Sequence, residues 1–216
     1  MTRCVAFAIL LFASGCASVE DANAERDFAA PAGDDLGGAG GDDLAGAGNA
    51  PPITCGGKHV VINEVQTGSA ASASDEFIEL YNQCAMPINL TGSSVVYRSA
   101  AGTSDVVVIG LTKTIDAGGY LLIAGPAFAA DGGSVPDQTY GAGKLAAAGG
   151  GVGLRDAAQM LVDSVGYGTA TNAFIEGSVA AAPASGQSLA RKPNGVDTNQ
   201  NALDFAVATP SPRAAN

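Results

Sequence analysis

The sequence contains no tryptophan, a single histidine and only 10 lysine and arginine residues, against 21 aspartate and glutamate residues. Its one adjacent basic pair is Arg191-Lys192, so the chain lacks the basic surface of a nucleic-acid-binding protein. A Ser–His–Asp hydrolase is disfavoured as well, because no G-x-S-x-G motif accompanies His59. We expect His59 to lie at the surface or at a strand edge, since it opens a predicted strand beside Lys58.

Long hydrophobic runs are also missing, since none approaches the roughly 18 residues that a membrane-spanning helix requires. The run from Cys4 to Phe12 has nine residues and follows Arg3, which is typical of a signal peptide. Small residues then lead into a cysteine in Ala13-Ser14-Gly15-Cys16. This stretch resembles the lipobox of bacterial lipoproteins, in which the cysteine is acylated and becomes the mature N-terminus.

We therefore predict a lipoprotein signal peptide over residues 1–15 and lipid on Cys16. The alternative is cleavage without lipid at a small-x-small site, either Gly15-Cys16-Ala17 or Ala22-Asn23-Ala24. Several acyl chains on one cysteine would anchor the protein firmly, since each buried methylene contributes about 0.8 kcal/mol. Because Ala17 rather than aspartate follows the cysteine, we expect an outer-membrane anchor in the cell envelope, facing the periplasm or the cell surface.

Cysteines are few, and two remain once Cys4 leaves with the signal peptide and Cys16 carries lipid. Two cysteines in an exported protein, Cys55 and Cys84, predict one disulfide. Two free, buried thiols are the alternative.

Residues 17–54 differ sharply in composition from the rest of the chain. They include the tandem repeat GDDLGGAG-GDDLAGAG (33–48). Residues 17–54 as a whole hold eight acidic residues and one basic residue, Arg26. Low hydrophobicity, high charge and abundant glycine predict that residues 16–54 are a lipidated cysteine followed by a disordered linker. This linker supplies −7 of the net charge of −11; residues 55–216, with 13 acids and eight bases, supply −5, and Arg3 supplies +1.

Residues 55–216 contain many short β-rich runs between Gly, Pro and Ser clusters, without a strong helical period. This pattern predicts one all-β domain, a sandwich or a barrel, whose core relies on Val, Leu, Ile and Ala. The predicted strands are residues 59–66, 76–82, 94–98, 105–110, 120–125, 151–156, 160–167 and 188–191.

Several motifs follow one another in an order that resembles the lamin tail domain family. They are VVINEV (60–65), DEFIELYN (75–82), INLTG (88–92), IDAGGYLLI (115–123), GVGLRDAAQMLVDSVGYG (151–168), GQSLAR (186–191), DTNQNALDF (197–205) and ATPSPRAAN (208–216). One departure is Ser93, where the family commonly has a tryptophan. The resemblance implies an immunoglobulin-like β-sandwich over residues 55–216 that acts as an interaction or tethering module.

Glu64 and Glu79 are the first candidates for a chemical site, because a hairpin of the first two predicted strands would place them on one face. If Gln66 pairs with Asp75, Glu64 lies opposite Phe77 and diagonal to Glu79. In the same register, a disulfide between the two cysteines would clamp the open end of the hairpin.

Two carboxylates at this spacing repel each other unless something neutralises them. The alternatives are pairing with basic side chains or backbone donors, a bound cation, or acid–base catalysis of the kind that glycosidases perform with two carboxylates. We favour the first, since the chain has no tryptophan to form a saccharide platform.

A second candidate for a cation site is the stretch DTNQN, in which Asp197, Asn199 and Asn201 alternate as at the start of a calcium-binding loop. The turn glycine and the bidentate glutamate of such a loop are absent, and Asx turns explain the same residues. Calcium is therefore a weak prediction at these residues and at Glu64 and Glu79, and no other cofactor is predicted.

These observations together predict a non-enzymatic, lipid-anchored envelope protein that presents its sandwich to an envelope or extracellular protein partner. The rival hypothesis is a divalent-cation-dependent envelope hydrolase, or an accessory subunit of one, that uses Glu64 and Glu79.

Overall fold

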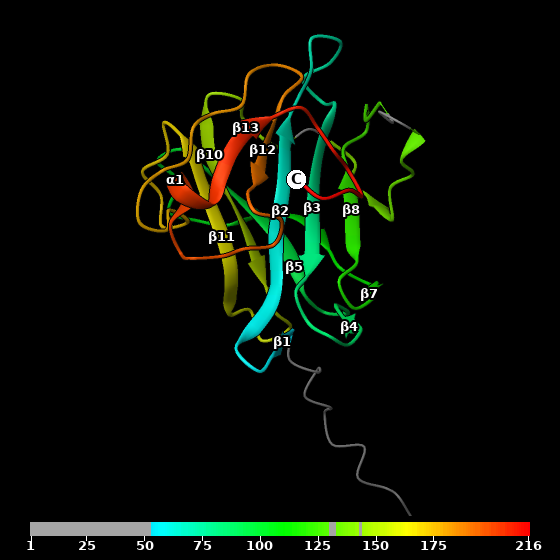
Figure 1. Ribbon diagram of the computed structural model, residues 1–216. Coiled ribbons are helices and arrows are strands. Elements are labelled where there is room, and N and C mark those ends of the chain that lie inside the picture. The colour runs from blue at the N-terminus through cyan, green and yellow to red at the C-terminus, as the bar shows by residue number, and fades with distance from the viewer. Residues whose placement is uncertain (1–52, 130–132, 143) are drawn as a thin grey trace, which may run out of the picture. The chain divides into compact units, whose positions relative to one another are not determined.

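The computed structural model describes residues 53–129, 133–142 and 144–216 (Figure 1). The predicted signal peptide, the predicted lipid on Cys16 and the linker up to Pro52 lie outside the described residues. Within the described part, no helix is long and apolar enough to cross a membrane. The elements are β1 (Thr54–Cys55), β2 (Lys58–Thr67), β3 (Glu76–Asn82), β4 (Ile88–Asn89), β5 (Ser94–Ser99), β6 (Val106–Gly110), β7 (Thr114–Ile115), β8 (Tyr120–Ala124), β9 (Gln138–Thr139), β10 (Gly149–Arg155), β11 (Leu161–Gly168), β12 (Ser188–Arg191), α1 (Asn201–Asp204) and β13 (Phe205–Ala208).

Two packed sheets form the predicted β-sandwich (Figure 1). The larger sheet has the order β13-β12-β2-β3-β8-β9, with β1 paired to β2, and the smaller has the order β11-β10-β5-β6. A two-stranded sheet joins β4 to β7. All eight predicted strands are present, with ends within two residues of the prediction.

Alternating side chains of the two sheets form one core. Val60 and Ile62 of β2 and Ile78 and Leu80 of β3 are fully buried in it. A β-bulge after Ile62 then shifts the alternation of β2, so that the next core residue is Val65. The smaller sheet contributes the apolar residues Val95, Tyr97, Val152, Leu154, Val165 and Tyr167.

This bulge positions the first candidate site. In an uninterrupted strand, Glu64 would share the core-facing side of Ile62, because side chains two residues apart point the same way. The extra residue, Asn63, turns Glu64 to the outer face of the larger sheet instead.

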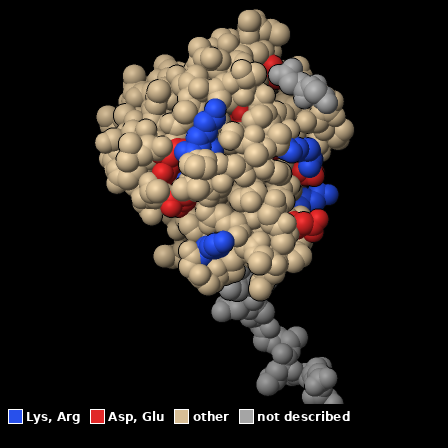
Figure 2. All heavy atoms as spheres, in the orientation of Figure 1, with Lys and Arg blue, Asp and Glu red and all other residues tan. Residues whose placement is uncertain are grey.

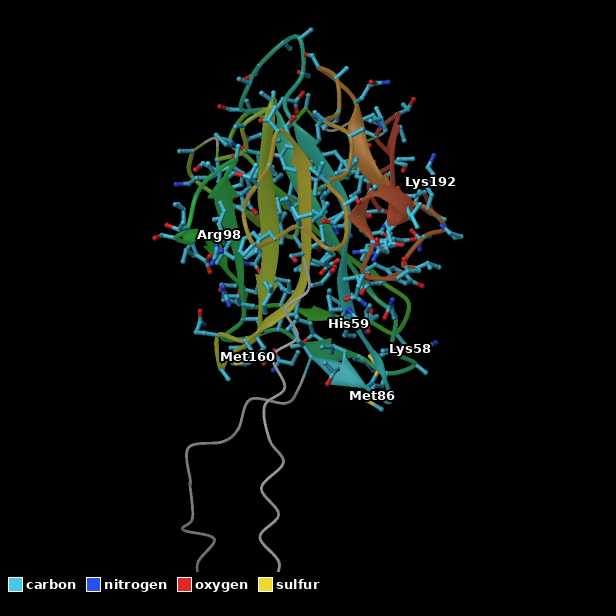
Figure 3. The ribbon with its side chains drawn as sticks, turned by 90° about the vertical axis from the view of Figure 1, so that its left-hand side faces the viewer. Lys58, His59, Met86, Arg98, Met160 and Lys192 are labelled. Carbon is cyan, nitrogen blue, oxygen red and sulfur yellow. A yellow bond between two sulfur atoms is a disulfide. The ribbon has the colours of Figure 1, made fainter. Side chains whose placement is uncertain are left out.

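A disulfide joins the ends of the first hairpin, as predicted. Strand β1 folds back on β2, where Cys55 pairs with Lys58. Cys55 and Cys84 form the disulfide, and their Cα atoms lie 6.0 Å apart. Figure 3 shows this disulfide at the same end of the domain as Lys58, His59 and Met86.

Candidate functional site

Glu64 and Glu79 lie directly opposite each other on β2 and β3. The predicted register is therefore wrong, because Gln66 rather than Glu64 lies opposite Phe77. The difference arises at the connecting loop (68–75), because the last pair before it is Thr67 with Glu76, one residue later on each strand than the predicted pair of Gln66 with Asp75. The bulge at Asn63 shifts only the pairs beyond it, such as Ile62 with Leu80. The two carboxylates are thus closer than the diagonal arrangement that the sequence suggested.

Protein donors surround this pair of carboxylates, which have no exposed surface. The Ser188 hydroxyl and the Ser211 backbone N–H donate to Glu64 Oε1 over 2.5 and 3.0 Å. The Arg213 backbone N–H donates to Glu79 Oε2 over 2.5 Å, and the Asn63 amide donates to Glu79 Oε1 over 3.3 Å. This arrangement favours neutralisation by protein groups over a bound cation, because donors already occupy three of the four oxygens.

Burial also changes the protonation of the pair. It raises the pKa of Glu79 to about 7, and the charge of Glu64 acts in the same direction. Burial likewise raises the pKa of Glu64, although the hydrogen bonds from Ser188 and Ser211 oppose the shift. At neutral pH, one proton on the pair would relieve the repulsion between two facing carboxylates.

A second cluster surrounds Arg191, which ends β12 and has no exposed surface. Its Nη2 donates to both oxygens of Asp163 over 3.1 and 3.0 Å. Its Nη1 donates to Asp197 over 3.1 Å and to Asp204 over 3.3 Å. The buried guanidinium therefore compensates three carboxylates that come from β11 and from the loop and helix before β13.

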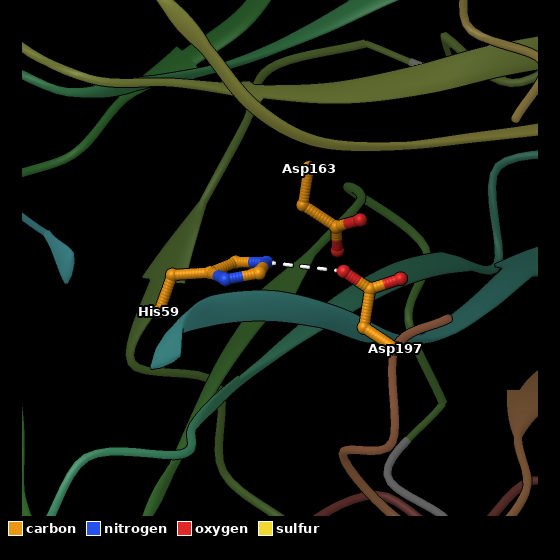
Figure 4. Close-up of side chains that lie close together, drawn as sticks. All are labelled: His59, Asp163 and Asp197. Carbon is orange, nitrogen blue, oxygen red and sulfur yellow. Dashed lines mark ion pairs between the residues drawn. The ribbon is translucent and has the colours of Figure 1, made fainter. Parts of the chain in front are cut away.

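His59, near the start of β2, belongs to this cluster and is only partly exposed. Its side chain is 22% exposed, and its Nε2 lies 3.2 Å from Asp197 Oδ2 (Figure 4). The contact with the Asp197 carboxylate raises the pKa of His59, and the same contact lowers the pKa of Asp197. The pair therefore favours a charged imidazole against an ionised carboxylate.

His59, Asp163 and Asp197 offer one ligand atom each within 4.8 Å of one another, which is a spacing that a metal ion could bridge. The residues around them do not fit a metal. Arg191 already places a positive charge between the two aspartates, and Asp163 Oδ2 also accepts the backbone N–H of Ile62. A metal ion would have to displace a fully buried arginine, so we assign this cluster to the fold.

The residues of the predicted calcium loop also serve the fold. Asp197 accepts the backbone N–H of Asn199, as in an Asx turn, and Asn199 has a left-handed φ of 55°. Asn201 is fully buried; its Oδ1 accepts the backbone N–H of Gly166 and of Glu176. The side chains of Asp197 and Asn201 are therefore used in hydrogen bonds within the protein.

A hollow of about 430 Å³ opens beside His59. Its polar groups are largely used within the protein, since Gln83 accepts the His59 backbone N–H and donates to the Gly195 carbonyl. Its lining residues are Gly57, Lys58, His59, Tyr81, Gln83, Asn194, Gly195, Val196 and Asp197. The hollow provides a small polar recess, without an assembled set of catalytic groups.

Comparison with known families gives one match. The family model of the Lamin Tail Domain matches residues 56–169, more than half of the 216-residue chain. The match includes the strands from β2 to β11 and ends before β12 and the C-terminal segment. A comparison with curated proteins finds no match.

Proposed function

This chain belongs to the lamin tail domain family, and from that premise we propose that it is a non-enzymatic envelope lipoprotein whose β-sandwich binds another protein. The fold supports an interaction module, since an immunoglobulin-like sandwich offers sheet faces, edges and loops to a partner. The lipobox-like Ala13-Ser14-Gly15-Cys16 and the acidic linker support an anchored domain held away from a membrane surface.

One observation carries the non-enzymatic part of the proposal. The carboxylates that a hydrolase would need, Glu64 and Glu79, have no exposed surface and accept hydrogen bonds from the protein's own C-terminal residues. A substrate could reach them only if Ser211 and Arg213 moved away. Glu64 and Glu79 are therefore structural residues that hold the C-terminal segment in place.

The rival hypothesis, a cation-dependent hydrolase, makes a separate prediction about stability. Calcium or magnesium bound to Glu64 and Glu79 would raise Tm progressively as its concentration exceeds Kd, because a ligand that binds only the folded state stabilises it. We expect Tm of the purified protein to be the same with calcium, with magnesium and with EDTA. A shift that Glu79→Gln abolishes would support the hydrolase instead.

Membrane attachment has a direct test in Cys16→Ser. If Cys16 carries the lipid, this variant should move from the membrane fraction to the soluble fraction of the cell envelope. Cys4→Ser is the matched control, because Cys4 lies within the predicted signal peptide, and it should remain with the membrane. Membrane association of Cys16→Ser that equals that of the wild type would contradict the lipid anchor.

Binding of a protein partner is tested by site-specific photo-crosslinking in the native cell. Crosslinkers at exposed positions on two parts of the domain, Val107 of β6 and Met86 beside the disulfide, survey its surface. We expect a discrete adduct with an envelope protein from one of them and none from the buried position Ile78. The absence of adducts from every exposed position, together with a hydrolytic activity that Glu79→Gln removes, would overturn the proposal.

A further inference from the structure

The C-terminal segment (209–216) lies across β2 and β3 in front of the larger sheet (Figure 1). Ser211 and Arg213, two residues apart, direct their backbone N–H groups at Glu64 and Glu79, which lie opposite each other on the two strands. Arg213 reaches this position with a φ of 66°, which residues other than glycine rarely adopt. The segment therefore contacts the sheet chiefly through the two buried carboxylates.

The last residue of the chain adds a third attachment point. Asn216 donates from Nδ2 to the carbonyl of Asn63, the bulged residue of β2, over 3.0 Å. Ser211 donates from its hydroxyl to Asn216 Oδ1 over 2.8 Å, which closes the segment on itself. The same bulge that turns Glu64 outward thus also presents the carbonyl that holds the end of the chain.

A neighbouring loop holds the outer side of the segment. Arg213 forms an ion pair with Asp137 at 2.8 Å and donates from Nη2 to the Val135 carbonyl over 2.7 Å. Ser134 donates from its hydroxyl to the Pro212 carbonyl over 3.3 Å. These contacts are partly exposed, so the buried carboxylates are the less solvated part of the attachment.

One oxygen of the site has no donor. Glu64 Oε2 is buried without a hydrogen-bond partner, while Glu64 Oε1 accepts two hydrogen bonds. An ionised carboxylate in that position, facing a second ionised carboxylate, is strongly disfavoured. A proton on one of the two acids removes the repulsion and allows the free oxygen to become a donor.

We propose that segment 209–216 is a proton-dependent strap: a proton on the facing pair Glu64 and Glu79 holds it on β2 and β3, and loss of that proton releases it. Release exposes the outer face of these two strands. The proposal goes beyond the function in the envelope, and it does not depend on the lipid anchor or on the identity of a partner.

The direction of the pH effect follows from the environment of Glu79. With the strap in place, burial raises the pKa of Glu79 to about 7 from an ordinary value of 4.5. When the strap leaves, water reaches the carboxylate and its pKa returns toward the ordinary value. The closed state therefore binds the proton more tightly, so opening becomes easier as pH rises from 4.5 through about 7 and then levels off.

Few charged groups face the pair from the surrounding elements. Lys192, just after β12, lowers the pKa of Glu64, and Arg213 of the strap lowers that of Glu79. Asp137 offsets the charge of Arg213 through their ion pair. Tyr120 on β8 is uncharged in this pH range, since its own pKa is raised, chiefly by burial. The carboxylates themselves are therefore the groups that titrate.

Amide hydrogen exchange of Ser211 and Arg213, followed by NMR on the full chain, tests the strap. After correction for intrinsic exchange, protection at both amides should fall on the order of 50-fold from pH 5 to 7.5, as linkage to one proton allows. The amide of Ile78 in the core should remain protected, which separates strap opening from global unfolding.

Isosteric variants identify the titrating group. Glu79→Gln and Glu64→Gln keep an oxygen acceptor but cannot ionise, so each should weaken or abolish the pH dependence while the strap stays protected. Asp137→Asn should lower protection equally at all pH values. Glu176→Gln is the matched control, because burial also raises the pKa of Glu176 to about 7 while its side chain contacts Ser164 and Asn201 instead of the strap.

Two outcomes would overturn the proposal. The first is protection at Ser211 and Arg213 that does not change between pH 5 and 7.5 in the wild type. The second is a wild-type pH dependence that survives in Glu79→Gln and Glu64→Gln alike. A direct NMR titration of the Glu79 side-chain carbon provides an independent check, and an ordinary acidic pKa there would equally contradict a proton on the pair.

Discussion

Arg191 has no exposed surface, and all three of its guanidinium nitrogens donate hydrogen bonds within the protein. Its Nε donates to the Ile62 carbonyl of β2, while Nη1 and Nη2 reach carboxylates of three other segments. The guanidinium also lies 4.4 Å from the ring centroid of Phe205. One residue thus joins β2, β11, β12 and the loop before β13.

Replacing Arg191 by methionine should be severely destabilising. The change leaves Asp163 and Asp204 without their compensating charge, while Asp197 keeps only His59, and removing one partner of a buried ion pair costs about 3–5 kcal/mol. Chemical denaturation of the purified protein measures this loss. Arg191→Lys keeps the charge but not the planar set of donors, so its stability should lie between that of the wild type and that of Arg191→Met.

Arg155→Met is the matched control for this prediction. Arg155 pairs with Asp105 near the surface, where both side chains are about one-fifth exposed, and such a pair contributes about 1 kcal/mol or less. Equal losses from Arg191→Met and Arg155→Met would contradict the central role of Arg191.

The pairing of Asp163 with Arg191 has a signal in the sequence that our prediction did not use. Asp163 has the same parity in β11 as the core residues Val165 and Tyr167, and Arg191 has the same parity in β12 as Leu189. Opposite charges at two core-facing positions of an all-β domain must find partners, because unpaired buried charges are strongly disfavoured. The other two carboxylates, Asp197 and Asp204, come from a loop and from the short helix α1, where no strand period predicts the direction of a side chain.

The first hairpin shows which features of an element the sequence could and could not predict. The strands themselves were predictable, because Val, Ile and Leu alternate between Gly and Ser clusters. The register was not, because nothing in the loop (68–75) marks the residues at which pairing begins, and the bulge at Asn63 leaves no mark in the pattern of apolar residues beyond an adjacent polar pair. Strands β1, β4, β7 and β9 have two residues each and are too short to carry a period.

Removing the disulfide should destabilise the hairpin and the domain. Cys55 and Cys84 are separated by 29 positions, and closing a loop of this length lowers the entropy of the unfolded chain by an amount equivalent to roughly 3–4 kcal/mol. Cys55→Ala/Cys84→Ala should therefore lower the free energy of unfolding by a few kcal/mol in urea denaturation. Reduction of the wild type should reproduce the loss.

The double variant provides the control for this reading. Adding reductant to Cys55→Ala/Cys84→Ala should leave its stability unchanged, because no bond remains to be reduced. If the reduced wild type and the oxidised wild type unfold at the same urea concentration, the disulfide does not stabilise the domain.

At the scale of the described domain, several charged side chains are buried in the interior. The face shown in Figure 2 is mostly uncharged, with only scattered acidic and basic side chains. Inside, Glu64, Glu79, Asp163 and Arg191 are all without exposed surface. Protonation of interior groups should therefore control the dependence of global stability on pH more than surface charge does.

The direction of that dependence follows from four groups. Burial raises the pKa of Glu79 and of Glu176 to about 7 from 4.5, so the stability associated with them is present below 4.5 and is lost as pH rises through 7. The raised pKa of His59 acts in the same sense from 6.5 upward. Asp197, with a lowered pKa, contributes stability above 3.8 that is lost on acidification.

We therefore expect the protein to be most stable between about pH 4 and 5 and to lose stability steadily toward pH 8, with a fall in Tm on the order of 10 °C or more. Thermal unfolding measured across this range tests the expectation. Glu79→Gln/Glu176→Gln should flatten the decline below pH 7, and His59→Gln should flatten the part above 6.5, because each removes a group that must change its charge. A Tm that rises from pH 5 to 8 in the wild type would show that these interior groups do not govern the stability of the domain.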